Sequence, residues 1–310
     1  MKYLLALLFM ALIIGANAQS RDELYKKARG FFEKEDYSNA LVQLNAVLAK
    51  DSTDLDGLIL KGNTLERLKK YQEAFDTYSY TVAMYPSDVI AINQRGLLLN
   101  KLQEFEYAIM DFTNALRLPS PDSLKLILYV NRGAAKVNIR DFKGAYDDFM
   151  AAYKIDSLQI GILNNLAAVC DEVGKGDQTL KYLYRVLEID STFIGAYGNI
   201  GFKYQEMGDY KKAIGFFDKV LSLSPDDALA YSNRSFNRYK LGDLAGALTD
   251  ANKAIELYPS NSYAFRNRAL IYLALKKNTE ACADLKEAID IGFTKMYGDE
   301  VQKLVSAHCQ

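Results

Sequence analysis

The stretch YSNRSFNRYKLGDLAGALTDANKAIELYPS (residues 231–260) decides the fold, because a loose copy of it stands 34 residues earlier, at 197–226. Few letters match between the two copies, but small, aromatic and turn-forming residues keep their places. A fixed period of this length is typical of repeat proteins, in which each unit packs on its sequence neighbours. The period extends far beyond these two copies.

One alanine marks the period along the chain. It recurs as Ala40, Ala74, Ala108, Ala145, Ala213, Ala247 and Ala281, with Thr179 at the one remaining place. Every step is 34 residues except the step from Ala108 to Ala145, which is 37. We expect the three additional residues in a surface loop at 119–125, because insertions cost least in exposed loops.

Each unit is expected to form two helices. In the first half of the quoted stretch, Tyr231 and Ser235 share one helical face. Gly242 then ends this helix, because glycine tolerates the left-handed conformation of a C-terminal cap. In the second half, Ala247 and Ala251 lie on one helical stripe. Proline follows at 259 and ends the second helix, because it lacks a backbone donor.

A small residue precedes each marker by twelve places. These residues are Ala28, Gly62, Gly96, Gly133, Ala167, Gly201, Ser235 and Ala269. Two helices approach closely only where neither presents a bulky side chain, so these positions predict the contact inside each pair. Large residues four places after the marker, such as Phe112 and Phe217, are expected to fill the space beside it. We interpret this pattern as core packing without catalytic meaning.

The units resemble tetratricopeptide repeats. Unit 194–227 carries the family pattern in Tyr197, Gly201, Tyr204, Gly208-Asp209-Tyr210, Ala213, Phe217 and Pro225. The resemblance covers eight units, 21–54, 55–88, 89–122, 126–159, 160–193, 194–227, 228–261 and 262–295. It implies an all-α, right-handed superhelical solenoid of helix-turn-helix repeats, with first helices on the concave face and second helices on the convex face. We expect residues 296–310 to form a C-terminal capping helix.

Residues 1–18 have the order of a secretory signal peptide. One lysine precedes an apolar run from Leu4 to Ile14, and Ala16-Asn17-Ala18 offers a signal-peptidase site. This run is shorter than the roughly 20 residues that a membrane-spanning helix needs. We therefore expect cleavage after Ala18, a mature chain whose repeats fill 19–295 without an integral membrane segment, and a periplasmic or secreted location.

The sequence offers few of the residues that catalytic and metal-binding sites need. The single histidine, His308, lies two residues from the end, and the three cysteines are far apart. Without the leader, 37 Lys and Arg stand against 39 Asp and Glu, a net charge of −2. Such a balance lacks the basic excess that binds nucleic acid. We expect no catalytic residue, metal or cofactor, no nucleic-acid partner, and a non-enzymatic interaction scaffold of the cell envelope.

Two of the cysteines are expected to form a disulfide. Cys282 lies in the eighth unit, on the side where a ninth would pack, and Cys309 ends the cap segment that takes this place. In an oxidising compartment a bridge between them would contribute about 3 kcal/mol in chain-entropy estimates. Two reduced thiols are the alternative. Cys170 is expected to be a small buried apolar residue.

The residues that face away from the second helices predict a partner-binding groove for a protein or peptide. The sixth position of consecutive units is Asn131, Asn165, Asn199, Asn233 and Asn267, and beside this ladder lie Phe202, Leu229, Phe236, Tyr263 and Leu270. Because an amide both donates and accepts, the ladder can pair with the backbone of an extended peptide, while apolar neighbours hold its side chains. Alternatively, asparagine at this position serves helix packing.

Two other functions remain open at this point. The chain could be a structural spacer or an oligomeric assembly unit that uses its convex face. It could also be an envelope enzyme module, which would need a paired acid and base in the groove. The sequence leaves the partner, the pathway and the oligomeric state undetermined.

The leader yields the first testable prediction. When the chain is expressed in a Gram-negative host, we expect the recovered protein to begin at Gln19, because the peptidase site precedes it. N-terminal sequencing or intact-mass measurement checks this. Recovery of a chain beginning at Met1 in the membrane fraction would contradict it.

Overall fold

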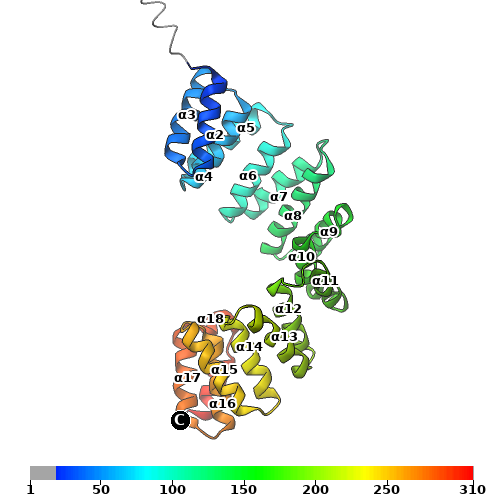
Figure 1. Cartoon of the computed structure of the whole chain (residues 1–310), viewed down its shortest axis with the longest axis vertical. Helices are drawn as coiled ribbons and strands as arrows, with labels where there is room; N and C mark the ends of the chain where they lie inside the picture. The colour runs from blue at the N-terminus through cyan, green and yellow to red at the C-terminus, as the bar shows by residue number, and fades with distance from the viewer. Residues whose placement is uncertain (1–18, 310) are drawn as a thin grey trace, which may run out of the picture. The chain divides into compact units, whose positions relative to one another are not determined.

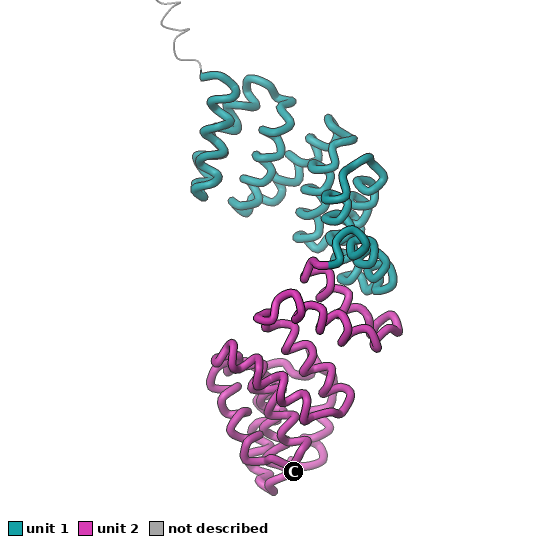
Figure 2. The backbone as a smooth tube through the Cα atoms, turned by 45° about the vertical axis from the view of Figure 1, so that its right-hand side comes forward, with its two compact units in different colours: residues 1–157 teal, residues 158–310 magenta. Residues whose placement is uncertain are grey.

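The computed structural model describes residues 19–309, and this part of the chain forms 18 α-helices and no strand (Figure 1). The expected all-α solenoid of repeated helix pairs is confirmed. The expected signal peptide lies outside the described residues. Two compact units divide the chain, one of residues 1–157 and one of residues 158–310 (Figure 2). Within each unit, every helix packs against the next one along the chain.

The helices alternate between first and second members of a pair. The first helices are α2 (Arg21–Glu33), α4 (Leu55–Arg67), α6 (Val89–Lys101), α8 (Asp122–Asn138), α10 (Ile160–Cys170), α12 (Ile194–Glu206), α14 (Ala228–Lys240) and α16 (Ser262–Ala274). The second helices are α3 (Tyr37–Lys50), α5 (Tyr71–Met84), α7 (Phe105–Leu116), α9 (Phe142–Ile155), α11 (Gly176–Ile189), α13 (Tyr210–Leu223), α15 (Leu244–Leu257) and α17 (Asn278–Asp290). A 3₁₀ turn, Asp171–Val173, follows α10.

The three additional residues of the fourth unit lengthen a helix. α8 has 17 residues and begins at Asp122, directly after Pro121, so residues 122–125 are helical. The expectation of a loop over 119–125 is therefore wrong for its second half. Proline suits the residue before a helix, because its fixed φ is compatible with a helical start and its missing N–H is not needed there.

The C-terminal cap consists of two short helices. α18 (Phe293–Tyr297) and α19 (Glu300–His308) are separated at Gly298, whose φ of +85° ends α18. The expected cap segment 296–310 thus contains one capping helix, α19, which packs on α17, while the additional helix α18 begins before it, at Phe293. Phe293 and Val301 are fully buried against Leu285 of α17.

A glycine meets an aromatic ring inside four of the helix pairs. A Cβ added at Gly62 would lie 2.2 Å from the ring of Tyr78, closer than real Cβ atoms approach. The same contact, between residues 16 apart, joins Gly96 to Phe112, Gly133 to Phe149 and Gly201 to Phe217. All four rings are buried. The small residues twelve places before the marker therefore act as the sequence predicted.

Each first helix is followed by a residue in the left-handed conformation. Glycine takes this place at 174, 208 and 242, with φ between 72° and 84°. The other five turns use Glu35, Lys69, Gln103, Arg140 and Lys276, with φ between 60° and 65°. The next residue then donates its N–H back to the helix, as Asp36 does to the carbonyl of Phe31 at 2.9 Å. This closure ends the helix as in a Schellman motif.

A buried ion pair links the two helices of four repeats, and sequence reasoning missed it. The pairs are Arg95–Asp111, Arg132–Asp148, Arg234–Asp250 and Arg268–Asp284, each with two N–H···O bonds of 2.6–2.9 Å. The hydrogen bonds to Asp284 raise the pKa of Arg268. Units 160–193 and 194–227 have apolar and aromatic residues at the same two places, namely Leu166 with Tyr182 and Ile200 with Phe216.

Removing one partner of such a pair should destabilise the chain. In the variant Asp284→Ala, the guanidinium of Arg268 keeps its partly buried place without a carboxylate, at a cost of about 3 kcal/mol. The double variant Arg268→Ile, Asp284→Phe copies the residues of unit 194–227 and should recover most of this loss. Urea unfolding followed by circular dichroism measures both.

The control for this experiment is Glu287→Ala, an exposed change on the same helix, which should leave the midpoint unchanged. A double variant as unstable as Asp284→Ala alone would show that the two arrangements are not interchangeable.

A disulfide fastens the C-terminal cap. Cys282 of α17 and Cys309 after α19 are bonded, with their Cα atoms 5.6 Å apart, and this is the pairing that the sequence predicted. Cys170 is free and fully buried, also as expected. The bond ties the cap directly to the last repeat.

Loss of this bond should loosen only the end of the chain. In the variant Cys282→Ser, Cys309→Ser, we expect amide exchange in α19 to accelerate about 100-fold, the equivalent of about 3 kcal/mol. Because a repeat protein opens locally from its ends, exchange in α10–α12 should not change. Hydrogen exchange with mass spectrometry reads both regions. Equal acceleration in both would argue against a local fastening.

Candidate functional site

The first helices of the second unit carry nine of the ten predicted groove residues. Asn165 lies on α10, Asn199 and Phe202 on α12, and Asn233 on α14. The same face also carries Leu229 and Phe236 of α14 and Tyr263, Asn267 and Leu270 of α16. Asn131 lies on α8 and belongs to the other unit. The part of the predicted groove within the second unit therefore extends from α10 to α16.

Three of the ladder asparagines join neighbouring first helices. Each donates from Nδ2 to a residue of the preceding first helix: Asn131 to Oδ1 of Asn93 at 3.0 Å, Asn199 to Oδ1 of Asn164 at 3.2 Å, and Asn267 to the carbonyl of Ser232 at 3.0 Å. These amides stabilise the stacking of repeats. For these three residues, the helix-packing interpretation of the ladder is supported.

Asn233 lacks such a bond. Its expected partner, 35 residues earlier as for Asn199 and Asn267, is Gly198, which has no side chain. Within residues 19–309, the side-chain amide of Asn233 makes no hydrogen bond, while its backbone carbonyl accepts one from Asn237. This amide is thus available to a ligand.

At the α16 end of the predicted groove, one residue is buried and another packs against the C-terminal segment. Asn267 is only 2% exposed and also accepts a hydrogen bond from Arg266. The ring of Tyr263 packs against Phe293 and Tyr297 of α18, with centroids 6.0 and 5.4 Å apart. Asn267 is therefore too buried to face a partner, whereas Tyr263 stays half-exposed beside the C-terminal segment, and its place in the groove remains a prediction.

A cavity of about 300 Å³ opens between α12 and α14. Its lining includes Gly195, Gly198, Phe202, Leu229 and Asn233. A Cβ at Gly198 would meet nothing within 4 Å, so the missing side chain leaves a hollow on α12. Phe202 and Leu229 are 47% and 61% exposed, so two large apolar side chains lie at the surface beside the same hollow. The structure thus brings four predicted residues together around one hollow, namely Asn199, Phe202, Leu229 and Asn233.

A second cavity of about 280 Å³ lies between α10 and α12 and shares Asn199 and Phe202 with the first. Its polar lining includes Asp171, Glu172 and Glu206, together with Lys203, whose ammonium lies 2.5 Å from Asp171 and 3.3 Å from Glu206. Burial lowers the pKa of Lys203, but these two hydrogen bonds outweigh it, so the pKa is raised. Sequence reasoning did not find these four residues.

The remaining predicted residues, Asn165, Phe236 and Leu270, are half-buried. The ring of Phe236 lies under two cations, with Nζ of Lys240 5.3 Å and the guanidinium carbon of Arg266 5.2 Å from its centroid. Arg266 is in turn paired with Glu300 of α19, through Nε and Oε1 at 3.1 Å. This part of the groove is partly covered by the chain's own charges.

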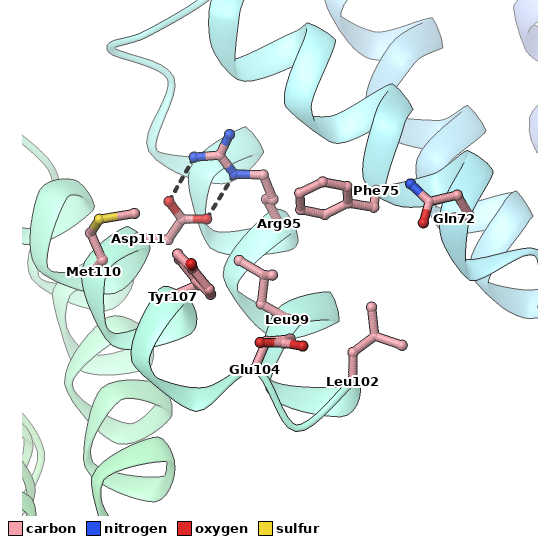
Figure 3. Close-up of a pocket in the computed structure, with 9 residues that line it drawn as sticks. All are labelled: Gln72, Phe75, Arg95, Leu99, Leu102, Glu104, Tyr107, Met110 and Asp111. Carbon is pink, nitrogen blue, oxygen red and sulfur yellow. Dashed lines mark hydrogen bonds and ion pairs between the residues drawn. The ribbon is translucent and has the colours of Figure 1, made fainter.

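The first unit contains a larger hollow, of about 440 Å³, between α5, α6 and α7 (Figure 3). Phe75 and Leu99 form apolar walls, and the Arg95–Asp111 ion pair lies at its edge (Figure 3). Tyr107 and Met110 at its rim are 59% and 51% exposed. Both residues lie on α7, a second helix. Their exposure is known only from the structure, so the sequence did not predict this hollow.

The described residues contain neither a cluster of metal ligands nor a helix suited to a membrane. Among residues 19–309, no group of three His, Cys, Asp or Glu side chains is placed to hold a metal ion. No helix within the same range has the length and apolar character that crossing a membrane requires.

Comparison with known proteins identifies the repeats. Tetratricopeptide repeat family models match residues 25–89, 195–227 and 237–292. The RNA polymerase II-associated protein 3 of Xenopus laevis is 27% identical over 113 residues, which are 36% of this chain and 17% of that protein. The chain thus aligns with about a sixth of the length of this relative.

Solved structures show the same fold. The C-terminal part of a repeat-containing protein from Cytophaga hutchinsonii superposes with a TM-score of 0.60 at 17% identity, covering 78% of this chain and 98% of that one. The Cut9–Hcn1 structure gives a TM-score of 0.60 at 16% identity, with 95% and 57% covered. YrrB, described as having an unusual peptide-binding site, gives 0.50 at 24% identity, with 64% and 97% covered. With the repeated helix pairs and the matched family models, this chain belongs to the tetratricopeptide repeat proteins.

Proposed function

We propose that the chain is a non-enzymatic scaffold that binds an extended segment of another protein in the groove of α10, α12 and α14. Tetratricopeptide repeats are generally interaction modules without catalytic activity. The observation that carries the proposal is the hollow at Gly198, where the amide of Asn233 has no partner and Phe202 and Leu229 are exposed.

These features match what an extended peptide offers. The amide of Asn233 can donate to a backbone carbonyl, as Asn267 does to that of Ser232, and its oxygen can accept from a backbone N–H. An apolar side chain of the peptide would enter the hollow and cover Phe202 and Leu229. Burial of these two exposed side chains supplies the hydrophobic part of the binding free energy.

The setting that we propose is the cell envelope, with the chain exported to the periplasm or secreted. Support comes from the leader-like residues 1–18 and from the Cys282–Cys309 disulfide, a bond typical of oxidising compartments.

Filling the hollow tests the groove. The variant Gly198→Leu places a side chain where a Cβ has no neighbour within 4 Å. We expect it to stabilise the helix by roughly 0.5–1 kcal/mol, because glycine is a poor helix former, and to weaken partner capture at least about tenfold. Thermal unfolding and quantitative affinity capture from the native cells measure the two effects.

The matched control is Gly215→Leu, because Gly215 also lies in a helix with open space around its Cβ, but on the second helix α13. It should be as stable as Gly198→Leu and retain the partners. If both variants capture the same partners as the unchanged chain, the groove is not the site.

A second candidate function uses the outer hollow of the first unit. The exposed Tyr107 and Met110 favour it, since apolar residues at the rim of a 440 Å³ cavity mark a contact surface. In this function the chain is a spacer that assembles with other proteins through its second helices. Retention of partners by Gly198→Leu and their loss in Tyr107→Ser, Met110→Ser would favour it over the groove.

A further inference from the structure

We infer that the segment bound in the groove carries a lysine or arginine side chain, which enters the cavity between α10 and α12, beside an apolar side chain in the cavity between α12 and α14. This inference rests on the proposed function, and it adds the chemistry of the partner. The two cavities share the ring of Phe202 and the amide of Asn199, so one continuous segment can occupy both.

Charge selects the occupant of the α10–α12 cavity. Three carboxylates, Asp171, Glu172 and Glu206, face a single ammonium, that of Lys203, which leaves a net charge of −2. Lys203 is bonded to Asp171 at 2.5 Å and to Glu206 at 3.3 Å. Glu172 is exposed and makes no ion pair within the described residues. A cation from the partner therefore has a free carboxylate to bind.

The geometry favours an organic cation. Although three carboxylates line this cavity, no group of His, Cys, Asp and Glu within residues 19–309 is close enough to hold a metal ion. The wall contains the ring of Phe202, and an ammonium or guanidinium over an aromatic face gains a further attraction. Lys203 shows that an ammonium is accommodated against these carboxylates.

The opposite end of the groove has the other sign. Lys240 and Arg266 lie over the ring of Phe236, and Glu300 already neutralises Arg266. A basic side chain is therefore attracted to the α10 end and repelled from the neighbourhood of Lys240. This asymmetry orients the bound segment as well as selecting it.

Selection from a phage-displayed library of short random peptides on the immobilised full chain tests the inference. We expect the recovered peptides to be enriched in lysine or arginine close to a large apolar residue. The variant Glu172→Lys, Glu206→Lys reverses the charge of the cavity from −2 to +2. It should lower the affinity of these peptides about tenfold or more, and selection on it should favour aspartate and glutamate.

Two controls accompany this variant. Glu287→Lys, Asp290→Lys makes the same charge change at exposed positions of α17 and should leave the selected peptides unchanged. Glu172→Gln removes one exposed carboxylate, which keeps the test valid if the double variant unfolds, and should weaken binding in the same direction.

The outcomes separate the inference from the function on which it rests. If binding is lost in Gly198→Leu, but the peptides lack basic residues or bind the charge-reversed variant equally well, the groove function stands and the inference is overturned. If no peptide is enriched, or binding survives Gly198→Leu, the groove function fails and the inference fails with it.

Discussion

The close approach of a glycine to an aromatic ring determines the geometry of four of the eight helix pairs. At Gly62 and Tyr78, even one methyl group would overlap the ring. In these four pairs the helices come together where the side chain is absent, and the ring fills the space beside that point. Because the contact recurs between residues 16 apart, the two helices of these four pairs meet at the same place in each repeat. Every surface described above depends on this regularity.

The period predicts the helices well, because it records which residues must be small or large inside each pair. It does not predict what happens between pairs. The three additional residues of the fourth unit become a helical turn because Pro121 suits the position before α8, a local effect that a period cannot contain. The C-terminal segment breaks at Gly298 for a similarly local reason.

The groove shows the same limit more clearly. Asn199, Asn233 and Asn267 occupy identical positions in their repeats, yet their side chains have different partners. Asn199 donates to an asparagine and Asn267 to a backbone carbonyl, whereas the side chain of Asn233 makes no hydrogen bond within the described residues. Their roles depend on the residue 35 places earlier, so a pattern read within one repeat cannot separate them. At Gly198, the hydrogen bond that would join two first helices is missing, and the candidate binding site lies at the same place. Proteins often leave polar groups unpaired where a ligand completes them.

The left-handed turns have a consequence for how the chain tolerates change. A residue other than glycine costs about 1 kcal/mol or more in this conformation. Four of the five such residues, Glu35, Lys69, Gln103 and Arg140, belong to the first unit, whereas all three glycines at this place belong to the second. Substitution of these four residues by glycine should therefore raise the thermal stability of the first unit. In the second unit, glycine already removes this strain from three of the four turns. The groove repeats can therefore accept more destabilising substitutions before they unfold, as a partner's sequence evolves.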